Sequence, residues 1–187
     1  MSLAARTSKR EAILEAAIRV LREQGLSGLK VEEVARAAEI GKGTVYLYFK
    51  DKRELLRQLV EHRTQAFYAD AEAIAKEDRP FFERLRDILE RRLDFVEEWR
   101  GLWGAVAAEV AQGEEKKAWL TGLHERYHRI LEELIQDGVH RGELRPDLNP
   151  ALVAAALAAM GCSPQLPFDR RAFLDEVIEI WKRGVGK

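Results

Sequence analysis

Apolar residues recur at three- and four-residue steps along most of the chain, and this spacing is typical of helices that bury one face. In residues 8–23 the recurring set is Ile13, Ala16, Ala17, Val20 and Leu21. No stretch alternates apolar and polar residues in the manner of a half-buried strand. Proline, which interrupts helices, occurs only five times in 187 residues. We therefore predict an all-α protein of about nine helices.

Residues that start or stop helices divide this pattern into segments. Asp51, Asn149 and Asp169 are good N-caps, Pro80 suits the first turn of a helix, and Gly25 suits a helix end. Short helices are predicted at residues 31–38 and 42–49, followed by a long helix to about residue 76. We therefore expect a three-helix unit at residues 1–50, joined by continuous helix to a helical body at residues 51–187.

The two short helices are separated only by Glu39-Ile40-Gly41. Two helices joined by such a turn form the unit that places its second helix in the major groove of DNA. Glycine lets the backbone approach phosphates closely, and hydroxyl, phenol and ammonium groups supply hydrogen-bond donors. Two plainer interpretations stay open, since Tyr46 could be a core aromatic and residues 50–53 an ordinary solvated helix start. The candidate DNA contacts here are Lys42, Gly43, Thr44, Tyr46, Tyr48 and Lys52.

The charges are unevenly distributed along the chain. The formal net charge is −1, but residues 1–60 contain 12 Lys and Arg against 8 Asp and Glu. A basic first third fits a chain that places this end against phosphate, although an excess of this size also arises by chance. The single Cys162 cannot form an intrachain disulfide, and neither a signal peptide nor a bilayer-long apolar run is present. We expect a cytoplasmic protein without membrane contact.

Residues 8–60 resemble the DNA-binding domain of the TetR family of transcriptional regulators. The family pattern of Thr, aliphatic, Tyr and Phe followed by Lys and Leu is matched at Thr44, Val45, Tyr46, Phe49, Lys52 and Leu55. The resemblance implies a repressor that binds a palindromic operator as a homodimer, with its reading helices in successive major grooves about 34–36 Å apart. It also implies that a small molecule in the helical body releases the protein from DNA.

Three positions depart from the family pattern. Glu39 occupies the turn position that is usually glycine, so a positive φ there would strain the backbone. Gly41 replaces the usual serine N-cap of the second short helix. Lys30 stands where the preceding helix usually begins with Thr or Ser. We expect its charge to replace a family phosphate contact, so Lys30 joins the candidate DNA-binding residues.

The helical body is expected to form the dimer and to hold the effector. A helix with small residues on all sides suits close packing, either at a dimer interface or in a monomer core. With the last helix it gives the candidate dimer residues Ala151, Ala155, Ala158, Ala159, Phe173, Val177 and Trp181. Other residues would line a pocket for a hydrophobic or amphipathic effector, unless they are plain core. These candidates are Phe67, Phe95, Trp99, Trp103, His124, Tyr127 and His128.

One motif suggests a different class of protein. Residues 124–128 match the H-E-x-x-H pattern of zinc hydrolases, with His124 and His128 as metal ligands and Glu125 as general base. Arg126 would place a cation beside the metal, and only Glu143 offers itself as a third ligand. We therefore predict no metal site, no cofactor and no enzyme activity. A zinc-dependent hydrolase and a helical protein-interaction adaptor are kept as alternatives.

Overall fold

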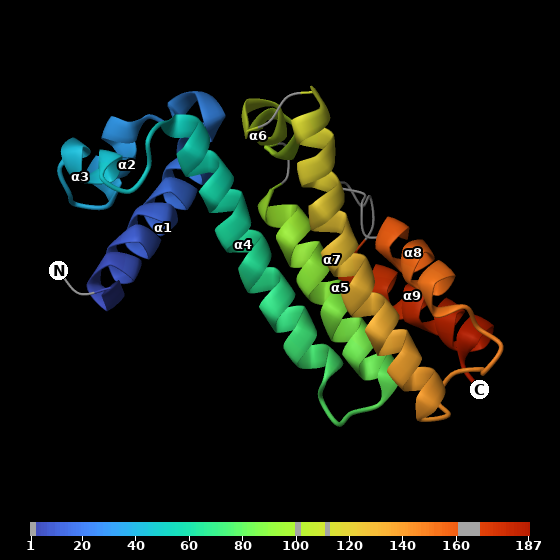
Figure 1. Cartoon of the computed structure of the whole chain (residues 1–187). Helices are drawn as coiled ribbons and strands as arrows, with labels where there is room; N and C mark the ends of the chain where they lie inside the picture. Colours follow the sequence, from blue (N-terminus) through green and yellow to red (C-terminus); the bar gives the residue numbers. More distant parts are fainter. Residues whose placement is uncertain (1–2, 100–101, 111–112, 161–168) are drawn as a thin grey trace. The chain divides into compact units, whose positions relative to one another are not determined.

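In a computed structural model the chain folds into helices joined by short connections (Figure 1). The structure describes residues 3–99, 102–110, 113–160 and 169–187, without the side chains of 3–8, 103–104, 113–117 and 160. Nine helices and no strand lie in these residues, which confirms the predicted all-α class. The helices are α1 (Leu3–Gly28), α2 (Val31–Ala37), α3 (Lys42–Tyr46), α4 (Lys52–Ala75), α5 (Phe81–Glu98), α6 (Trp103–Val110), α7 (Gly113–His140), α8 (Pro150–Met160) and α9 (Arg170–Val185).

The contacts divide the chain into two compact units. Unit 1 contains Met1–Thr64 and Gly101–Ala118, and unit 2 contains Gln65–Arg100 and Trp119–Lys187. Helix α4 therefore contributes residues to both units. The expected domain boundary at residue 50 remains a prediction, because these units are defined by contacts and not by independent folding.

The three N-terminal helices of unit 1 surround one core. Helix α1 loses its regular geometry at Gly25, where a φ of 69° lies in the left-handed region that glycine adopts without strain. The chain then turns back, and α2 packs on α1 while α3 packs on α2 (Figure 1). The core residues that these helices share are at most 2% exposed, and they include Ile13, Leu14, Ala17, Val34, Val45 and Phe49.

Side-chain caps fix the starts of three later helices. The Asp51 carboxylate accepts a hydrogen bond of 2.8 Å from the amide of Glu54 at the start of α4. Asn149 caps α8 in the same way at 3.2 Å, and Asp169 caps α9 at 2.9 Å. Each cap satisfies a backbone N–H that the helix itself leaves free. All three caps were predicted from the sequence, whereas Pro80 lies one position before α5 as its N-cap residue.

A buried arginine joins three helices at one end of unit 2. Arg84 on α5 is 1% exposed, and it donates hydrogen bonds of 2.7 Å to the Ala75 carbonyl of α4 and to the Asp137 carboxylate of α7. Nearby, the Glu143 carboxylate accepts a hydrogen bond of 2.6 Å from the amide of Phe81, which is the first residue of α5. Because a buried guanidinium requires acceptors, this network holds together the end of α4, the start of α5 and the last turns of α7.

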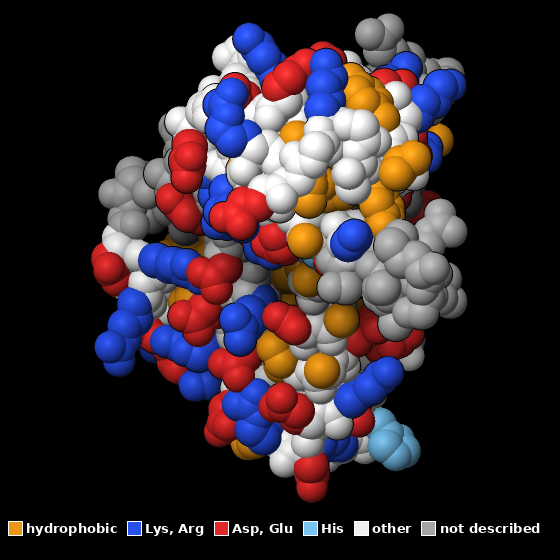
Figure 2. Space-filling view, turned by 90° about the vertical axis from the view of Figure 1, so that its left-hand side faces the viewer, with side chains coloured by type: hydrophobic (Ala, Val, Ile, Leu, Met, Phe, Trp, Pro, Cys, Tyr) orange, Lys and Arg blue, Asp and Glu red, His pale blue; other side chains and the backbone are white. Residues whose placement is uncertain are grey.

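Charges of both signs are interspersed on the face shown in Figure 2. Ion pairs among the described residues include Arg79 with Asp87 at 2.6 Å and Arg170 with Asp94 at 2.7 Å. Pairs of this exposed kind contribute little to the free energy of folding, but they keep the surface polar. None of the helices in the described part of the chain has the length and apolar character needed to cross a membrane.

Candidate nucleic-acid interface and effector core

The turn between α2 and α3 has the hydrogen bonds of a Schellman motif. The amide of Ile40 donates to the Ala35 carbonyl at 3.0 Å, and the amide of Glu39 donates to the Arg36 carbonyl at 3.1 Å. Glu39 has a φ of 55°, the left-handed conformation that this motif requires and that glycine adopts best. The backbone strain expected at Glu39 is therefore present in the turn that positions α3.

Helix α3 turns one face to the core and the opposite face to the surface. Val45 and Phe49 are 1% and 2% exposed. The residues exposed on the outer face are Lys42, Gly43, Tyr46 and Leu47, and at about 100° per residue these four share one side of the helix. Because Tyr46 is 46% exposed, the alternative that it is a core residue is wrong.

Two glycines leave the backbone beside α3 accessible. A Cβ atom added at Gly43 would meet nothing within 4 Å, and one added at Gly41 would meet only the Thr44 hydroxyl oxygen at 3.9 Å. Packing within the chain therefore does not require glycine at either position. Because these two glycines have no side chains, an external group such as a phosphate can approach the backbone closely there.

Lys42 is held across the turn by Glu32. Its ammonium group forms an ion pair with the Glu32 carboxylate of α2 and lies 5.8 Å from the centroid of the Tyr46 ring. The hydrogen bond between them lowers the pKa of Glu32 and raises the pKa of Lys42, so both groups are charged at neutral pH. The two side chains are 53% and 50% exposed, so a phosphate group can compete with Glu32 for the ammonium.

The other predicted DNA contacts lie around α3 with different partners. Lys30 is exposed at the N-cap position of α2, and its side chain makes no capping hydrogen bond. Thr44 is half-buried, and the Tyr48 hydroxyl is buried without a hydrogen-bond partner in the described residues. Lys52 donates a hydrogen bond of 3.0 Å to the Leu26 carbonyl, so one of the three ammonium donors serves the fold. No hydrogen bond joins the other two donors to the described residues, and the contact of Lys52 with phosphate stays a prediction.

Leu47 is an outer-face residue that the sequence analysis missed. Its side chain is 77% exposed, more than any other exposed large hydrophobic residue in the described chain. An apolar side chain is not expected among phosphate contacts, which are made by polar groups. The available signal was its spacing: a residue two positions from both Val45 and Phe49 points away from a helix core.

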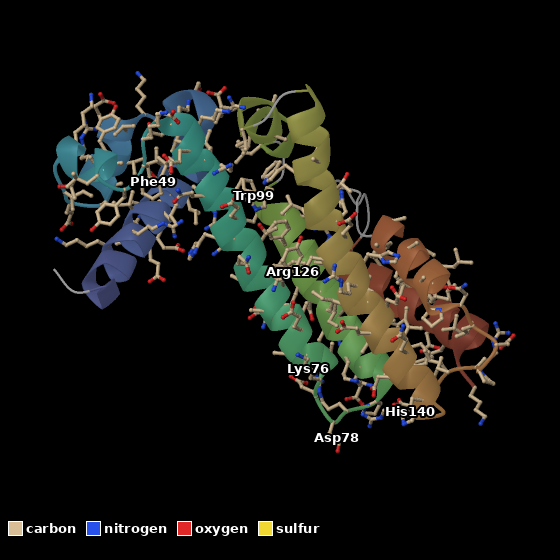
Figure 3. The ribbon with its side chains drawn as sticks, in the orientation of Figure 1. Phe49, Lys76, Asp78, Trp99, Arg126 and His140 are labelled. Carbon is tan, nitrogen blue, oxygen red and sulfur yellow. The ribbon has the colours of Figure 1, made fainter. Side chains whose placement is uncertain are left out.

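Four predicted pocket residues form a packed aromatic cluster in unit 2. The Phe67 ring centroid lies 5.3 Å from that of Phe95 and 5.4 Å from that of Tyr127, and Phe95 lies 6.3 Å from Trp99 (labelled in Figure 3). All four side chains are at most 9% exposed. In this packing they are core, and their role in holding an effector stays a prediction. The predicted Trp103 side chain lies outside the described residues.

His124 and His128 lie on a groove between α7 and α8. The groove has a volume of about 570 Å³, and Ala155, Ala158 and Ala159 line its other side. The Nε2 atom of His128 lies 3.0 Å from the Ala151 carbonyl oxygen. Within the described ranges no three His, Cys, Asp or Glu side chains come together as metal ligands. The zinc-hydrolase alternative therefore gains no support from the geometry.

The predicted dimer residues differ in exposure. Ala155 and Ala159 are exposed, whereas Ala151, Ala158, Phe173 and Trp181 are half-buried. Val177 is only 6% exposed and packs inside unit 2, so it has almost no surface to give to a partner and we leave it out of the dimer surface. Leu152 and Ile180, which the sequence analysis did not select, are 69% and 58% exposed on α8 and α9.

Two sequence models of one family match the chain. Residues 13–59 match the model described as bacterial regulatory proteins, tetR family, and residues 78–165 match the tetracyclin repressor-like C-terminal domain. The chain belongs to the TetR family. It is thus a helix-turn-helix transcriptional regulator, of the ligand-responsive DNA-binding class that the sequence predicted.

Named TetR-family relatives are similar over different lengths. An uncharacterized helix-turn-helix regulator of Haemophilus influenzae is 34% identical over 99 residues, which are 53% of this chain and 48%, about half, of that protein. The fatty acid metabolism regulator protein of Bacillus subtilis is 26% identical over 141 residues (75% of this chain, 73% of that protein). The repressor DhaR of a Mycobacterium species is 27% identical over 161 residues (83% and 79%).

Solved structures share the fold. A TetR-family regulator of Mesorhizobium loti is 20% identical, with a TM-score of 0.76 over 100% of both chains. FadR of Bacillus subtilis, solved in complex with stearoyl-CoA, is 23% identical, with a TM-score of 0.62 over 93% of this chain and 87% of that chain. At these identities the likeness establishes the fold alone.

Proposed function

We propose that this TetR-family chain is a cytoplasmic repressor that binds a palindromic operator as a homodimer, without catalysis, and leaves the DNA when an effector binds. The observation that carries the DNA-binding part is the outer face of α3, where Lys42, Gly43 and Tyr46 are exposed while Val45 of the same helix is buried. Lys30, Thr44 and Lys52 would contact phosphates. Lys42, Tyr46 and Leu47 would reach base edges or the adjoining backbone, whereas the buried Tyr48 hydroxyl would not.

The dimer surface that we propose is the apolar side of α8 and α9. Leu152 and Ile180 are among the few large hydrophobic side chains that the described residues leave exposed, and Ala155 and Ala159 lie beside Leu152 on α8. Large exposed apolar side chains favour a partner, and small residues let helices approach closely. A two-fold dimer carries two copies of α3, so its operator should be an inverted repeat.

The effector that we propose is a hydrophobic or amphipathic molecule bound against the aromatic residues of α4, α5 and α7. Phe67, Phe95, Trp99 and Tyr127 supply a large buried apolar surface there. The similar FadR of Bacillus subtilis was solved with stearoyl-CoA, which is amphipathic. Because the rings are now packed together, binding must separate them, and a ligand that favours the separated arrangement shifts the protein toward it.

A selection from a pool of random DNA tests the proposal. We expect an inverted repeat to be enriched and its binding to weaken steeply with salt, because phosphate contacts release counterions. Tyr46→Ala should weaken binding to the selected repeat, and Lys52→Ala should weaken binding to all sequences about equally. Lys76→Ala, which removes an exposed charge from unit 2 (Figure 3), is the matched control and should change nothing. Enrichment of no inverted repeat would count against the proposal.

A further inference from the structure

Arg92 on α5 is a half-buried cation that no carboxylate of the described residues balances. Its guanidinium carbon lies 5.2 Å from the ring centroid of Tyr127, 5.7 Å from that of Phe95 and 5.9 Å from that of Phe67. These rings belong to α7, α5 and α4, so the guanidinium lies among three helices of unit 2. Its Nε atom is buried without an acceptor, and no hydrogen bond or ion pair joins Arg92 to another described residue.

Other arginines of the same unit have carboxylate partners. Arg84 donates to Asp137 at 2.7 Å. Arg126 (labelled in Figure 3) pairs with Glu72 at 2.9 Å while its guanidinium carbon lies 4.8 Å from the Tyr68 ring centroid. The buried Nε–H of Arg92 has lost its hydrogen bonds to water without gaining an acceptor, and aromatic rings compensate only part of that cost. A local cost that packing does not explain is typical of a functional position.

The neighbouring phenol does not supply the missing negative charge. The Tyr68 hydroxyl donates a hydrogen bond to the Leu123 carbonyl. Burial raises the pKa of Tyr68, and this effect exceeds the opposing influence of the positive charges of Arg92 and Arg126. Tyr68 is therefore neutral at physiological pH, and the described residues of the aromatic cluster contain a cation without an anion.

We propose that Arg92 binds the acidic group of the effector, and that the effector is an amphipathic organic acid whose apolar body lies against the aromatic cluster. This inference rests on the proposed ligand response. A planar guanidinium donates two parallel hydrogen bonds to a carboxylate or a phosphate group, and the arginine has five N–H groups to offer. Phe67, Phe95 and Tyr127 surround the same point with apolar surface.

The acid has to open the cluster to enter it. The cavity beside Arg92 on the side of α8 and α9 has a volume of about 10 Å³, which is the space of about one water molecule. Binding therefore separates side chains of α5 from their neighbours. An acid that pairs with Arg92 stabilises this separated arrangement, and so gives the effector a means to shift the protein away from its DNA-bound form.

Matched acids and neutral analogues test the inference on the full chain bound to its selected operator. The probes are dodecanoate against dodecanamide, dodecyl phosphate against dodecanol, and 2-naphthoate against 2-naphthamide. Release of fluorescent operator DNA is measured by anisotropy. We expect at least one acid to act at roughly tenfold to hundredfold lower concentration than its neutral partner, the difference that a charge-assisted hydrogen-bonded pair supplies. The carboxylate and phosphate arms show which acidic group is preferred.

Three variants separate Arg92 from charge in general. Arg92→Met keeps the apolar stem and should abolish the preference for acids, while operator binding without acid stays unchanged. Arg91→Met removes an exposed charge from the next position of α5 and should keep the preference. Arg92→Lys keeps the charge without the planar fork and should retain a weakened preference. Removal of an unbalanced cation should also leave the melting temperature of Arg92→Met equal to or above that of the wild type.

Three results would overturn the inference: no response of the wild type to any acid, an equal response to acids and neutral partners, or an acid preference that persists in Arg92→Met. If Arg92→Met does not fold, the inference is still tested by the response of the wild type to each acid and its neutral analogue, and by the acid preference of Arg92→Lys. Failure of the wild type to bind any operator would instead contradict the proposed function, so the two failures are distinguishable.

Discussion

Leu47 and Lys42 share the outer face of α3, but they differ in their contacts with the rest of the chain. Lys42 is bound to Glu32, whereas Leu47 is 77% exposed. An ammonium group gains from phosphate or from a guanine edge, while a leucine side chain gains only from an apolar group, and the apolar group in the major groove is the thymine methyl. The same face therefore offers two kinds of contact with DNA.

We predict that Leu47 contacts a thymine methyl group. Replacing single thymines of the selected operator by deoxyuridine removes only that methyl, and at one position it should weaken wild-type binding roughly fourfold, or about 0.8 kcal/mol. The Leu47→Ala variant should bind the operator with thymine at this position and the operator with deoxyuridine there with equal affinity. Anisotropy titrations check this, and identical wild-type affinity for every thymine-to-deoxyuridine operator would rule the contact out.

We predict that Glu32 restrains Lys42 in the free protein. Glu32→Gln should tighten operator binding severalfold and steepen its salt dependence by about one unit, because the ammonium becomes free to neutralise a phosphate. The measurement belongs at neutral pH. The ion pair is lost only as the pH falls through the lowered pKa of Glu32, below 4.5, or rises through the raised pKa of Lys42, above 10.5.

The control is the same substitution in a Lys42→Ala background. The gain from Glu32→Gln should shrink or vanish there, because the freed group is absent. An equal gain in both backgrounds would mean that Glu32 acts only through the general charge of the surface.

At the scale of elements, the turn between α2 and α3 combines a demanding geometry with an unsuitable residue. Its Schellman hydrogen bonds require the left-handed conformation at position 39, and glutamate occupies that position. The helix starts carry no such conflict, because Asp51, Asn149 and Asp169 each accept the capping hydrogen bond that their residue types favour.

We predict that Glu39→Gly stabilises the chain. Glycine adopts a φ of 55° without strain, and the gain should be about 0.5–1 kcal/mol after the greater freedom of glycine in the unfolded state is subtracted. Urea denaturation followed by circular dichroism measures it. The matched control is Ala38→Gly, one residue earlier in helical geometry, which should destabilise by a similar amount. A loss of stability in both variants would contradict the strain at Glu39.

Sequence reasoning worked best for these local features. Caps, the stop at Gly25, the positive φ at Glu39 and the buried spacing of Val45 and Phe49 depend on neighbours within a few residues. The partners of Lys42 and Lys52 were not predictable, because Glu32 and the Leu26 carbonyl reach them through tertiary contacts. The burial of Val177 within the chain was not predictable for the same reason, since helical spacing shows that a face is apolar but not what covers it.

At the scale of the whole molecule, the proposal requires two copies of α3 on one DNA. The described chain leaves Leu152 of α8 and Ile180 of α9 exposed, and these are the side chains whose burial a second copy would explain. The aromatic cluster and Arg92 of unit 2 give the effector both apolar surface and a charge.

We predict that Leu152→Glu and Ile180→Glu produce monomers of about the 21.4 kDa chain mass, because a buried carboxylate at the interface has no partner. Sedimentation velocity checks the mass, and the monomers should bind the operator more weakly. Leu47→Glu, which places the same charge on a comparably exposed leucine outside the proposed surface, should leave the wild-type mass unchanged. Wild-type mass in both α8 and α9 variants would remove this surface from the proposal.

Dimeric recognition of a palindrome can be tested by the affinity of the wild type for three versions of its selected operator: the intact inverted repeat, a single half-site, and the repeat with five base pairs inserted at its centre. Five base pairs rotate one half-site by about half a helical turn, which puts the two on opposite faces of the duplex. We predict two chains bound to the intact repeat, with at least about tenfold weaker binding to both altered versions. Equal affinity for all three would contradict a dimeric reader of palindromic DNA.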